Sequence, residues 1–305
     1  MEAYLDNSAT TSCSKAATEK MVELLTQDYG NPSSLHMKGV IAEKYITEAK
    51  KKIAKTLKVD EKELVFTSGG TESNNLAIIG SALANKRTGM HVITTAIEHH
   101  AVLNCMKELE TQGYEVTYLQ PDKLGNITPE ALKAALRKDT ILVSIMMVNN
   151  EVGSVMPISA MAKLTHKICP DAIFHTDAVQ GFLKIPFAAK TLGADLISIS
   201  SHKVHGPKGA GALYISPRLK SFPALLLGGG QESGFRSGTE ATPAILGFAA
   251  AATAGAATFR EDIAREKALY AFKKTFFGQL NGREKAFVRF RHYAVMVVAY
   301  LRNKM

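Results

Sequence analysis

The sequence places one lysine in a setting that favours covalent chemistry. Lys203 lies in a turn rich in serine, histidine and glycine, with the sequence SSHKVHGPKGAG over residues 200–211. A lysine in such a turn, unlike one on a solvated helix face, is a candidate for Schiff-base formation, because burial and neighbouring cations lower its pKa and make the amine a nucleophile. The competing interpretation is a basic loop that binds phosphate or nucleic acid through charge alone.

A second segment has the pattern of an anion-binding turn. The sequence TSGGTESN over residues 67–74 follows a strand-like run and opens a helix. Free backbone amides and hydroxyls at a helix N-terminus bind anions, most often phosphate. A tight strand-to-helix turn without a ligand explains the same pattern equally well. The segment has neither the Gly-Lys-Ser/Thr of a Walker loop nor a GxGxxG dinucleotide motif.

Two further polar groups follow apolar, strand-like runs. His99, in EHHA over residues 98–101, comes just after HVITT, and Asp177, in HTDAVQ over residues 175–180, follows another apolar run. A metal pair is the alternative for His99 and His100, but adjacent residues on a helix point apart. A carboxylate at a buried strand end needs a cationic partner, which a metal, an arginine or a protonated heterocycle supplies.

The alternation of apolar and amphipathic runs predicts the elements that carry these residues. It indicates an α/β fold with a mostly parallel sheet and helices on both faces. Ligands of such sheets bind at the carboxyl ends of the strands, where all four segments fall. Strands are expected over residues 63–67, 91–95, 115–119, 140–148, 172–175, 196–200 and 211–215. Helices are expected over residues 38–57, 101–111 and 242–277, and two further helices are expected to begin at about residue 72 and at residue 128.

Together the four segments have the chemistry that pyridoxal 5'-phosphate requires. They supply a phosphate cradle, a histidine to stack on a ring, a carboxylate for a pyridinium nitrogen and an imine-forming lysine. This cofactor needs covalent anchorage, phosphate neutralisation and an acid that tunes its ring nitrogen. The sequence therefore predicts a pyridoxal-phosphate site, without a metal.

With this set of segments, the sequence resembles the cysteine desulfurases of the class V aminotransferase-like group, which feed iron–sulfur cluster assembly and tRNA thiolation. The matching stretches run in the family's order over about residues 4–277. They are residues 4–11, 30–34 with His36, 67–75, 98–99, 148–153, 175–180, 200–211 and 228–230 with 236–239. The resemblance implies a fold-type I pyridoxal-phosphate-dependent transferase, with a mostly parallel seven-stranded sheet and an incomplete C-terminal small domain.

The resemblance also implies a role for each matched position. Lys203 would hold the cofactor covalently, His99 would stack on its ring and Asp177 would pair with its ring nitrogen. Gln180 would reach the phenolic oxygen, and Asn150 would lie on the substrate side. The implied phosphate ligands are the Gly70 amide, Thr71, Ser200 and His202. Thr239 would reach the phosphate from a partner subunit, which implies a homodimer.

The implied substrate is L-cysteine, and the implied products are L-alanine and an enzyme persulfide. A sulfur-acceptor or scaffold protein is a further expected partner. The alternatives that the residues leave open are a selenocysteine lyase or another class V aminotransferase, and a non-catalytic scaffold that keeps the pyridoxal-phosphate fold.

The segments that do not fit this family lead to a further expectation. The family delivers sulfur through a cysteine in a serine-rich loop of its C-terminal domain, and Cys13, Cys105 and Cys169 do not match it. Each is expected to be a small buried residue, with the best claim to reactivity at Cys13.

Resemblance to the family fades after about Gly278, so we expect a lost reading frame or a truncation near residues 279–282, and impaired activity. The expected domains are an N-terminal segment over 1–14, a large cofactor domain over 15–250, and a linking helix with a divergent small-domain start over 251–305.

Charge and composition bound the remaining function classes. The chain has 305 residues and a formal net charge of +9, and residues 278–305 carry six basic side chains but one acidic side chain. The rest is nearly balanced, without a basic stripe with interleaved aromatics, so direct nucleic-acid binding is not expected. Three cysteines without a CxxC motif predict a reducing, cytoplasmic setting. We expect no secretory signal and no membrane span. Of the two longest uncharged stretches, residues 243–259 are too weakly hydrophobic to span a membrane and residues 294–301 are too short.

Overall fold

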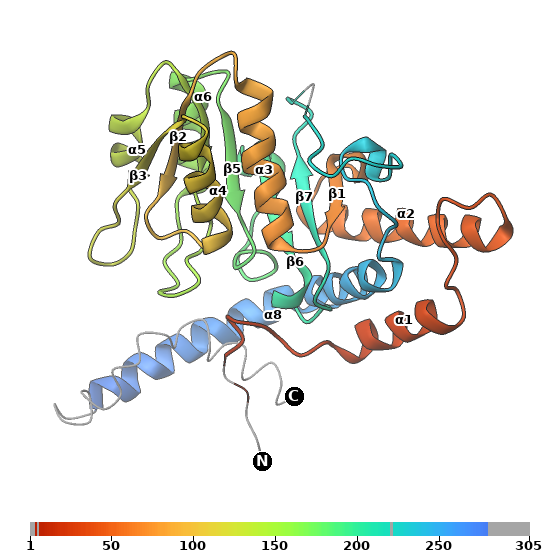
Figure 1. Ribbon diagram of the computed structural model, residues 1–305. Helices are drawn as coiled ribbons and strands as arrows, with labels where there is room; N and C mark the ends of the chain where they lie inside the picture. Colours follow the sequence, from red (N-terminus) through yellow and green to blue (C-terminus); the bar gives the residue numbers. More distant parts are fainter. Residues whose placement is uncertain (1–3, 5, 220–221, 280–305) are drawn as a thin grey trace.

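The fold is organised around one seven-stranded sheet (Figure 1). The computed structural model describes residues 4, 6–219 and 222–279. The strand order is β1-β7-β6-β5-β4-β2-β3; β7 runs antiparallel to both of its neighbours, β1 and β6, and all other neighbouring pairs are parallel. The strands are β1 Leu64–Thr67, β2 His91–Thr95, β3 Glu115–Leu119, β4 Thr140–Ser144, β5 Ile173–Asp177, β6 Leu196–Ser200 and β7 Gly211–Ile215.

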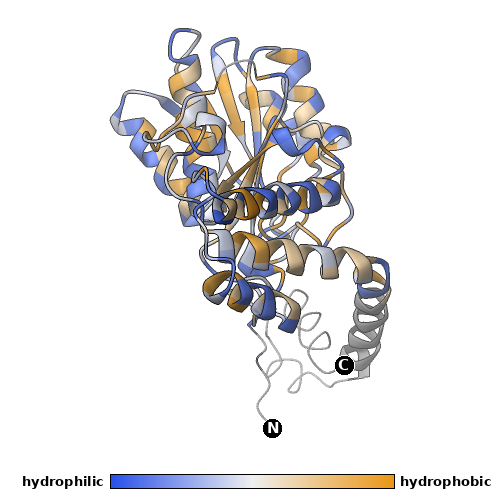
Figure 2. Ribbon diagram, turned by 90° about the vertical axis from the view of Figure 1, so that its right-hand side faces the viewer, coloured by the Kyte–Doolittle hydropathy of each residue, from blue (hydrophilic) through white to orange (hydrophobic). Residues whose placement is uncertain are grey.

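The sheet is covered on both faces because its strands carry apolar side chains on both sides. In β4, Leu142 packs into the cluster on one face and Val143 into the cluster on the other. All residues of β4, β5, β6 and β7 are buried, as expected for strands of a sheet that helices cover on both faces. Figure 2 shows hydrophobic residues along the strands and hydrophilic residues on the outward sides of the helices.

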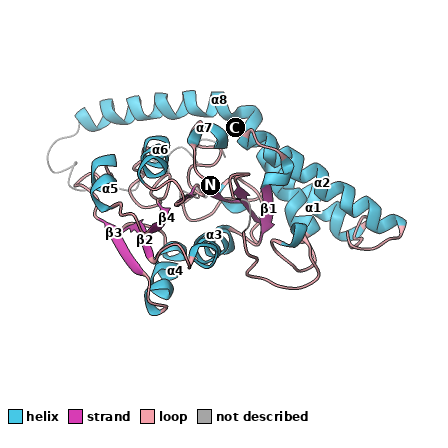
Figure 3. Cartoon of the chain, turned by 90° about the horizontal axis from the view of Figure 1, so that it is seen from above, coloured by secondary structure: helices cyan, strands magenta, loops and turns pink. Residues whose placement is uncertain are grey.

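The helices form two layers, visible from above in Figure 3. Helices α3 and α4 cover one face, and α2, α5, α6 and α8 contribute to the core on the other face. Helix α1 packs against α8, which also contacts α2. The helices are α1 Lys15–Thr26, α2 Met37–Leu57, α3 Gly70–Asn85, α4 His100–Thr111, α5 Pro129–Ala135, α6 Ile158–Ile168, α7 Ala189–Leu192 and α8 Thr242–Gln279, with short 3-10 turns at Glu61–Glu63, Ser201–Lys203 and Glu232–Gly234.

Local sequence signals explain where several of these helices begin. Thr128 caps α5 by accepting a hydrogen bond from Ala131 N, and Pro129 occupies the first helical position, as predicted. Helix α3 begins directly after Gly69, whose φ of 148° is a conformation that side-chain-bearing residues rarely adopt. The first turn of α3 is thereby brought directly to the end of β1.

The predicted strand over residues 140–148 is wrong in length. Strand β4 ends at Ser144, and the chain then leaves the regular ladder, although Ile145 N and Met147 N still donate to backbone oxygens of β5. Val148 instead forms an isolated bridge with Val155. The apolar pattern continues past the strand because residues 145–148 are buried, and burial alone does not distinguish a strand from a packed loop.

Helix α8 also differs from expectation in its hydropathy. Residues Thr242–Ala264 are long and apolar enough to span a membrane, with a mean hydropathy of 1.3 over an 18-residue window, whereas the sequence predicts that residues 243–259 are too weakly hydrophobic. Half of that window is buried in the protein, and Ile245, Phe248 and Ala252 belong to the core. We therefore interpret it as a core helix. The predicted domain boundary at 250/251 falls within α8 and stays a prediction, and residues 280–305 of the basic tail lie outside the described residues.

Candidate active site

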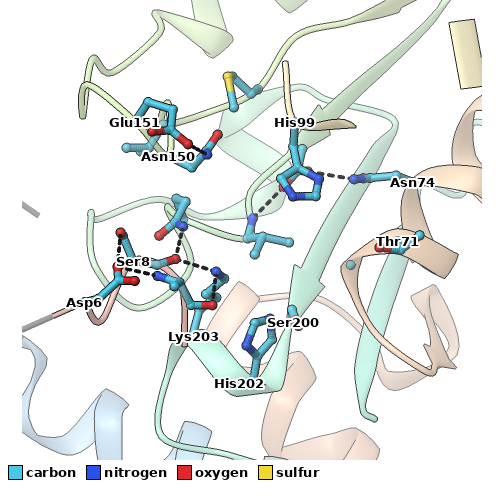
Figure 4. Close-up of a pocket in the computed structure, with 17 residues that line it drawn as sticks. Asp6, Ser8, Thr71, Asn74, His99, Asn150, Glu151, Ser200, His202 and Lys203 are labelled. Atoms are coloured by element: carbon cyan, nitrogen blue, oxygen red, sulfur yellow. Dashed lines mark hydrogen bonds between the residues drawn. The ribbon is translucent and has the colours of Figure 1, made fainter. Parts of the chain in front are cut away.

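A cavity of about 480 Å³ opens at the carboxyl ends of β2, β4, β5 and β6, next to the N-terminus of α3. This is where a parallel sheet is expected to bind its ligand. Figure 4 shows the lining side chains, which come from the strand ends, the first turns of α3 and the N-terminal segment. They are Asp6, Ser8, Ala9, Gly70, Thr71, Asn74, His99, Met146, Val148, Asn150, Glu151, Asp177, Val179, Gln180, Ser200, His202 and Lys203.

Lys203 ends the 3-10 turn that follows β6. Its Nζ donates hydrogen bonds to the backbone oxygens of Ser8 and, at 2.6 Å, of Ala9. Burial lowers the pKa of Lys203, and the carboxylates of Asp6 and Asp177 partly oppose that shift. A lowered pKa raises the fraction of neutral amine, which is the nucleophilic form.

The N-terminal segment is fixed to this turn by the side chain and backbone of Thr11. Both Thr11 N and Thr11 Oγ1 donate to the backbone oxygen of His202 at 2.9 Å, and His205 N donates to Thr11 Oγ1 at 2.8 Å. Gln180 Nε2 binds the same segment through the Ser8 oxygen at 2.9 Å. These contacts place Asp6 and Ser8 at the cavity, although neither is among the site residues predicted from the sequence.

Asp177 is the last residue of β5, and its carboxylate is buried. Its Oδ2 accepts a hydrogen bond from Asn74 Nδ2 at 2.7 Å, and its Oδ1 accepts one from Val179 N at 2.9 Å. Burial raises the pKa of Asp177, opposed by those hydrogen bonds and by the nearby His99 and Lys203. The geometry favours a cationic ligand, because a positive charge at this point would offset the cost of burying the carboxylate.

The end of the cavity beside α3 has the features of a phosphate site. The Ser200 hydroxyl is buried and has no hydrogen-bond partner within the described part of the chain. Gly70 starts α3, where a Cβ atom would lie 2.8 Å from Cγ2 of Val179, so the backbone there admits no side chain without a shift. Amides and hydroxyls at the start of a 16-residue helix suit an anion.

His202 adjoins this end of the cavity as a neutral ring. Burial lowers the pKa of His202 to about 4, with a further contribution from the positive charges of Lys203 and Lys208. Its Nδ1 lies 3.1 Å from Thr10 Oγ1. A neutral imidazole can donate one hydrogen bond to an anion without adding a buried charge of its own.

His99 and Asn150 line the cavity from two neighbouring loops (Figure 4). His99 is the N-cap of α4, and its Nδ1 accepts a hydrogen bond from Ala101 N at 3.1 Å. Asn150 Nδ2 donates to Glu151 Oε1 at 2.8 Å. The rings of His99 and His100 are 6.3 Å apart at 63°, and within the described ranges no group of three His, Cys, Asp or Glu side chains could hold a metal ion.

Nine of the ten residues predicted for the site line this one cavity. Thr239 does not line it: it is exposed in the loop before α8. Asn74 was missed, although its position one helical turn after Gly70 puts it on the same side of α3. Of the cysteines, Cys105 and Cys169 are buried as expected, whereas Cys13 is exposed, contrary to expectation. None of the three lines this cavity.

Comparison with known proteins decides the family. The profile described as Aminotransferase class-V matches residues 3–288, about ten residues further than the resemblance predicted from the sequence. The chain belongs to the class-V aminotransferases. "Cysteine desulfurase IscS" of Methanosarcina thermophila is 47% identical over 85% of this chain and 63% of that protein, and "Putative cysteine desulfurase IscS 1" of Bacillus subtilis is 48% identical over 80% and 64%. The chain thus spans somewhat less than two thirds of these relatives.

Solved structures of this class-V chain's relatives confirm the predicted fold. A "NIFS-like protein" superposes with a TM-score of 0.86 at 39% identity, covering 89% of this chain and 74% of its own. "SspA in complex with cysteine" superposes with a TM-score of 0.79 at 41% identity, covering 82% of this chain and 72% of its own. The predicted resemblance to cysteine desulfurases and the mostly parallel seven-stranded sheet are both confirmed.

Proposed function

We propose that this chain binds pyridoxal 5'-phosphate and acts as a cysteine desulfurase, converting L-cysteine to L-alanine with transfer of sulfur to a thiol. One observation carries the proposal: Lys203, Asp177 and His99 line the same cavity beside the N-terminus of α3. The names of the relatives and the neighbour solved with cysteine support the choice of substrate. Iron–sulfur cluster assembly or tRNA thiolation is the proposed destination of the sulfur.

The residues present fit the proposed cofactor. The unpartnered Ser200 hydroxyl, the Gly70 amide and the neutral His202 suit a phosphate, together with Thr71. The Asp177 carboxylate suits a protonated ring nitrogen, because it forms no salt bridge among the described residues and its burial raises its pKa. Bound there, the cofactor supplies an electron sink for bonds at the substrate's α-carbon.

The chain's own groups would each do one task in this reaction. The Lys203 amine would anchor the cofactor and move a proton at the substrate's α-carbon, for which a lowered pKa is required. His99 would cover the ring, and Asn150 would orient the substrate from the neighbouring loop. Gln180 would direct its amide toward the phenolic oxygen from the position where it now binds Ser8.

Sulfur transfer requires a thiol that the described cavity does not contain. The balanced reaction takes L-cysteine and a thiol to L-alanine and a persulfide, so the carbon–sulfur bond breaks and a sulfur–sulfur bond forms. Burial raises the pKa of Cys105 to about 11 and also raises that of Cys169, which disfavours their thiolates. Because neither these two cysteines nor the exposed Cys13 lines the cavity, we assign the acceptor thiol to another source.

The proposed assembly is a cytoplasmic homodimer. Thr239 is exposed and lies away from its own cavity, which suits a residue that reaches a partner's phosphate. Free cysteines are typical of a reducing compartment. A sulfur-acceptor or scaffold protein is the further partner that such a reaction needs.

The first test is the visible spectrum of the purified protein in the presence of pyridoxal phosphate. We expect an absorption band from covalently bound cofactor in the wild type and its loss in Lys203→Ala, because Nζ is the anchoring atom. Lys208→Ala, in the same loop, is the matched control and should keep the band. A wild type without a band at saturating cofactor would overturn the proposal and favour a non-catalytic protein.

The second test measures alanine released from L-cysteine with and without dithiothreitol as a thiol acceptor. Because the described cavity has no cysteine, we expect alanine formation to depend on the added thiol. The variants Cys13→Ala, Cys105→Ala and Cys169→Ala should each leave the rate within about twofold of the wild type. Loss of alanine formation in one of them would show that this cysteine is the acceptor instead.

A further inference from the structure

Two loops that carry site residues are joined by buried side chains which themselves do not line the cavity. One is the β2–α4 loop, residues 96–99, which ends in His99, and the other is the segment after β4, residues 145–154, which includes Asn150. Their connection depends on Glu98 and Asn149, both of which are buried.

The Glu98 carboxyl makes the first connection. Its Oε1 accepts hydrogen bonds from Thr95 Oγ1 at 2.9 Å and from Met146 N at 2.8 Å. Met146 comes just after β4 and lines the cavity. Because β4 has ended, this backbone N–H has left the strand ladder, and the carboxyl oxygen satisfies a donor that would otherwise be buried without a partner.

The Asn149 amide makes the second connection in the opposite direction. Its Nδ2 donates to the backbone oxygen of Ile97 at 2.9 Å, in the loop that precedes His99. Its Oδ1 accepts from the N–H groups of Glu151 and Val152, each at 2.9 Å, and so shapes the turn that contains Asn150. Each loop thus provides one buried side chain that binds the backbone of the other loop.

We propose that Glu98 and Asn149 are positioning residues that clamp these two loops together and hold His99 and Asn150 at the cavity. The inference rests on the proposed function, since it assigns the clamp to the binding of pyridoxal phosphate. Neither side chain lines the cavity, so both act through the residues beside them.

The charge state of Glu98 is consistent with this role. Burial raises the pKa of Glu98 to about 8, with Asp177 contributing in the same direction and the bonds from Met146 N and Thr95 opposing it. The carboxyl is therefore mostly neutral near pH 7. A neutral Glu98 bridges the loops without placing a second negative charge beside Asp177, whose charge is needed for the ring nitrogen.

The test compares Glu98→Ala and Glu98→Gln by spectral titration with pyridoxal phosphate. We expect the dissociation constant to rise about tenfold or more in Glu98→Ala, the effect of leaving Met146 N unpaired. Glutamine keeps the accepting oxygen, so Glu98→Gln should stay within about threefold of the wild type. Asn149→Ala breaks the other connection and should also weaken binding.

Asp195→Ala is the matched control for a merely structural effect. Asp195 is a buried carboxyl that also accepts a hydrogen bond from a strand backbone N–H, that of Phe174 at 2.8 Å. It directly precedes β6 and so lies at the amino ends of the parallel strands, opposite the cavity. This variant should lower the midpoint of thermal unfolding and leave the cofactor dissociation constant unchanged. Equal weakening in Asp195→Ala, or unchanged binding in Glu98→Ala, would overturn the clamp.

Hydrogen exchange of the cofactor-free protein separates the clamp from the proposed function. Peptides that cover residues 96–100 and 145–152 should exchange faster in Glu98→Ala and in Asn149→Ala than in the wild type or Asp195→Ala. If the wild type binds no pyridoxal phosphate but these loops loosen as described, the proposed function fails and the clamp stands without its ligand. Unchanged exchange in both variants would refute the clamp itself.

Discussion

At the scale of single residues, Ser200 has opposite expected effects on stability and on ligand binding. Its buried hydroxyl has no partner among the described residues. An unsatisfied buried polar group costs about 1–3 kcal/mol, so Ser200→Ala should stabilise the cofactor-free protein by about 1 kcal/mol in urea unfolding. The same variant should weaken pyridoxal phosphate binding about fivefold or more, because a phosphate ligand is lost.

Pyridoxal without its phosphate is the control ligand for Ser200→Ala. Its affinity should not change, since the hydroxyl is assigned to the phosphate and not to the ring. Equal weakening for both ligands would place Ser200 at another part of the cofactor, and a destabilised variant would mean that the hydroxyl has a partner in solution.

The residues that the sequence predicted and those that it missed differ in how local their signals are. Lys203 and Asp177 stand out because each combines a reactive side chain with the end of an apolar run. Ser8 became visible as a cavity residue only in the structure, since its contact with Lys203 joins positions 195 residues apart. The bond between Glu98 and Met146 spans 48 residues and gives no local pattern either.

At the scale of elements, strand boundaries were predictable where turns or helices follow the apolar run directly. The bounds of β2, β3, β6 and β7 agree with expectation to the residue. The strand over 140–148 was overestimated because its second half is buried loop, and α1, α6 and α7 were not predicted. Packing against α8 stabilises α1, and that contact between the two ends of the described chain has no counterpart in local sequence.

Helix α8 is the element whose packing is most open to test. Phe248 is fully buried, and its ring makes an edge contact with Phe182 at 6.1 Å between centroids. Phe248→Ala should lower the free energy of unfolding by about 3–5 kcal/mol, measured by urea titration, because it leaves a cavity between α8 and the sheet. Thr253→Ala on the exposed side of the same helix should change it by less than about 0.5 kcal/mol. Similar losses for both variants would mean that the packing shown for α8 is not the packing in solution.

At the scale of the whole molecule, the amino ends and the carboxyl ends of the parallel strands bury carboxyl groups in different electrostatic settings. At the amino ends, Asp195 binds Arg218 at 2.7 Å and His166 at 2.9 Å. Burial favours a higher pKa for Asp195, but these partners lower it below the ordinary value. At the carboxyl ends, Asp177 and Glu98 are buried with raised pKa values. At the cavity, the burial of the Asp177 carboxylate is therefore unfavourable and a bound cation would relieve it, whereas Arg218 and His166 already compensate Asp195.

This asymmetry predicts how folding stability depends on pH. The folded-state pKa of Glu98 is about 8, against an ordinary value of 4.5, so between these values the folded state holds a proton that the unfolded state has lost. Its contribution to stability is therefore complete below about pH 4.5 and is lost as the pH rises toward 8, with a slope of at most about 1.4 kcal/mol per pH unit. Glu98→Gln does not titrate at this position, so the difference between the two proteins reports the titration of Glu98 together with its coupling to Asp177. Urea unfolding from pH 5 to 9 should show the wild type losing stability relative to Glu98→Gln up to about pH 8 and no further loss above it. Parallel pH profiles would mean that Glu98 is ionised in the folded protein near neutral pH.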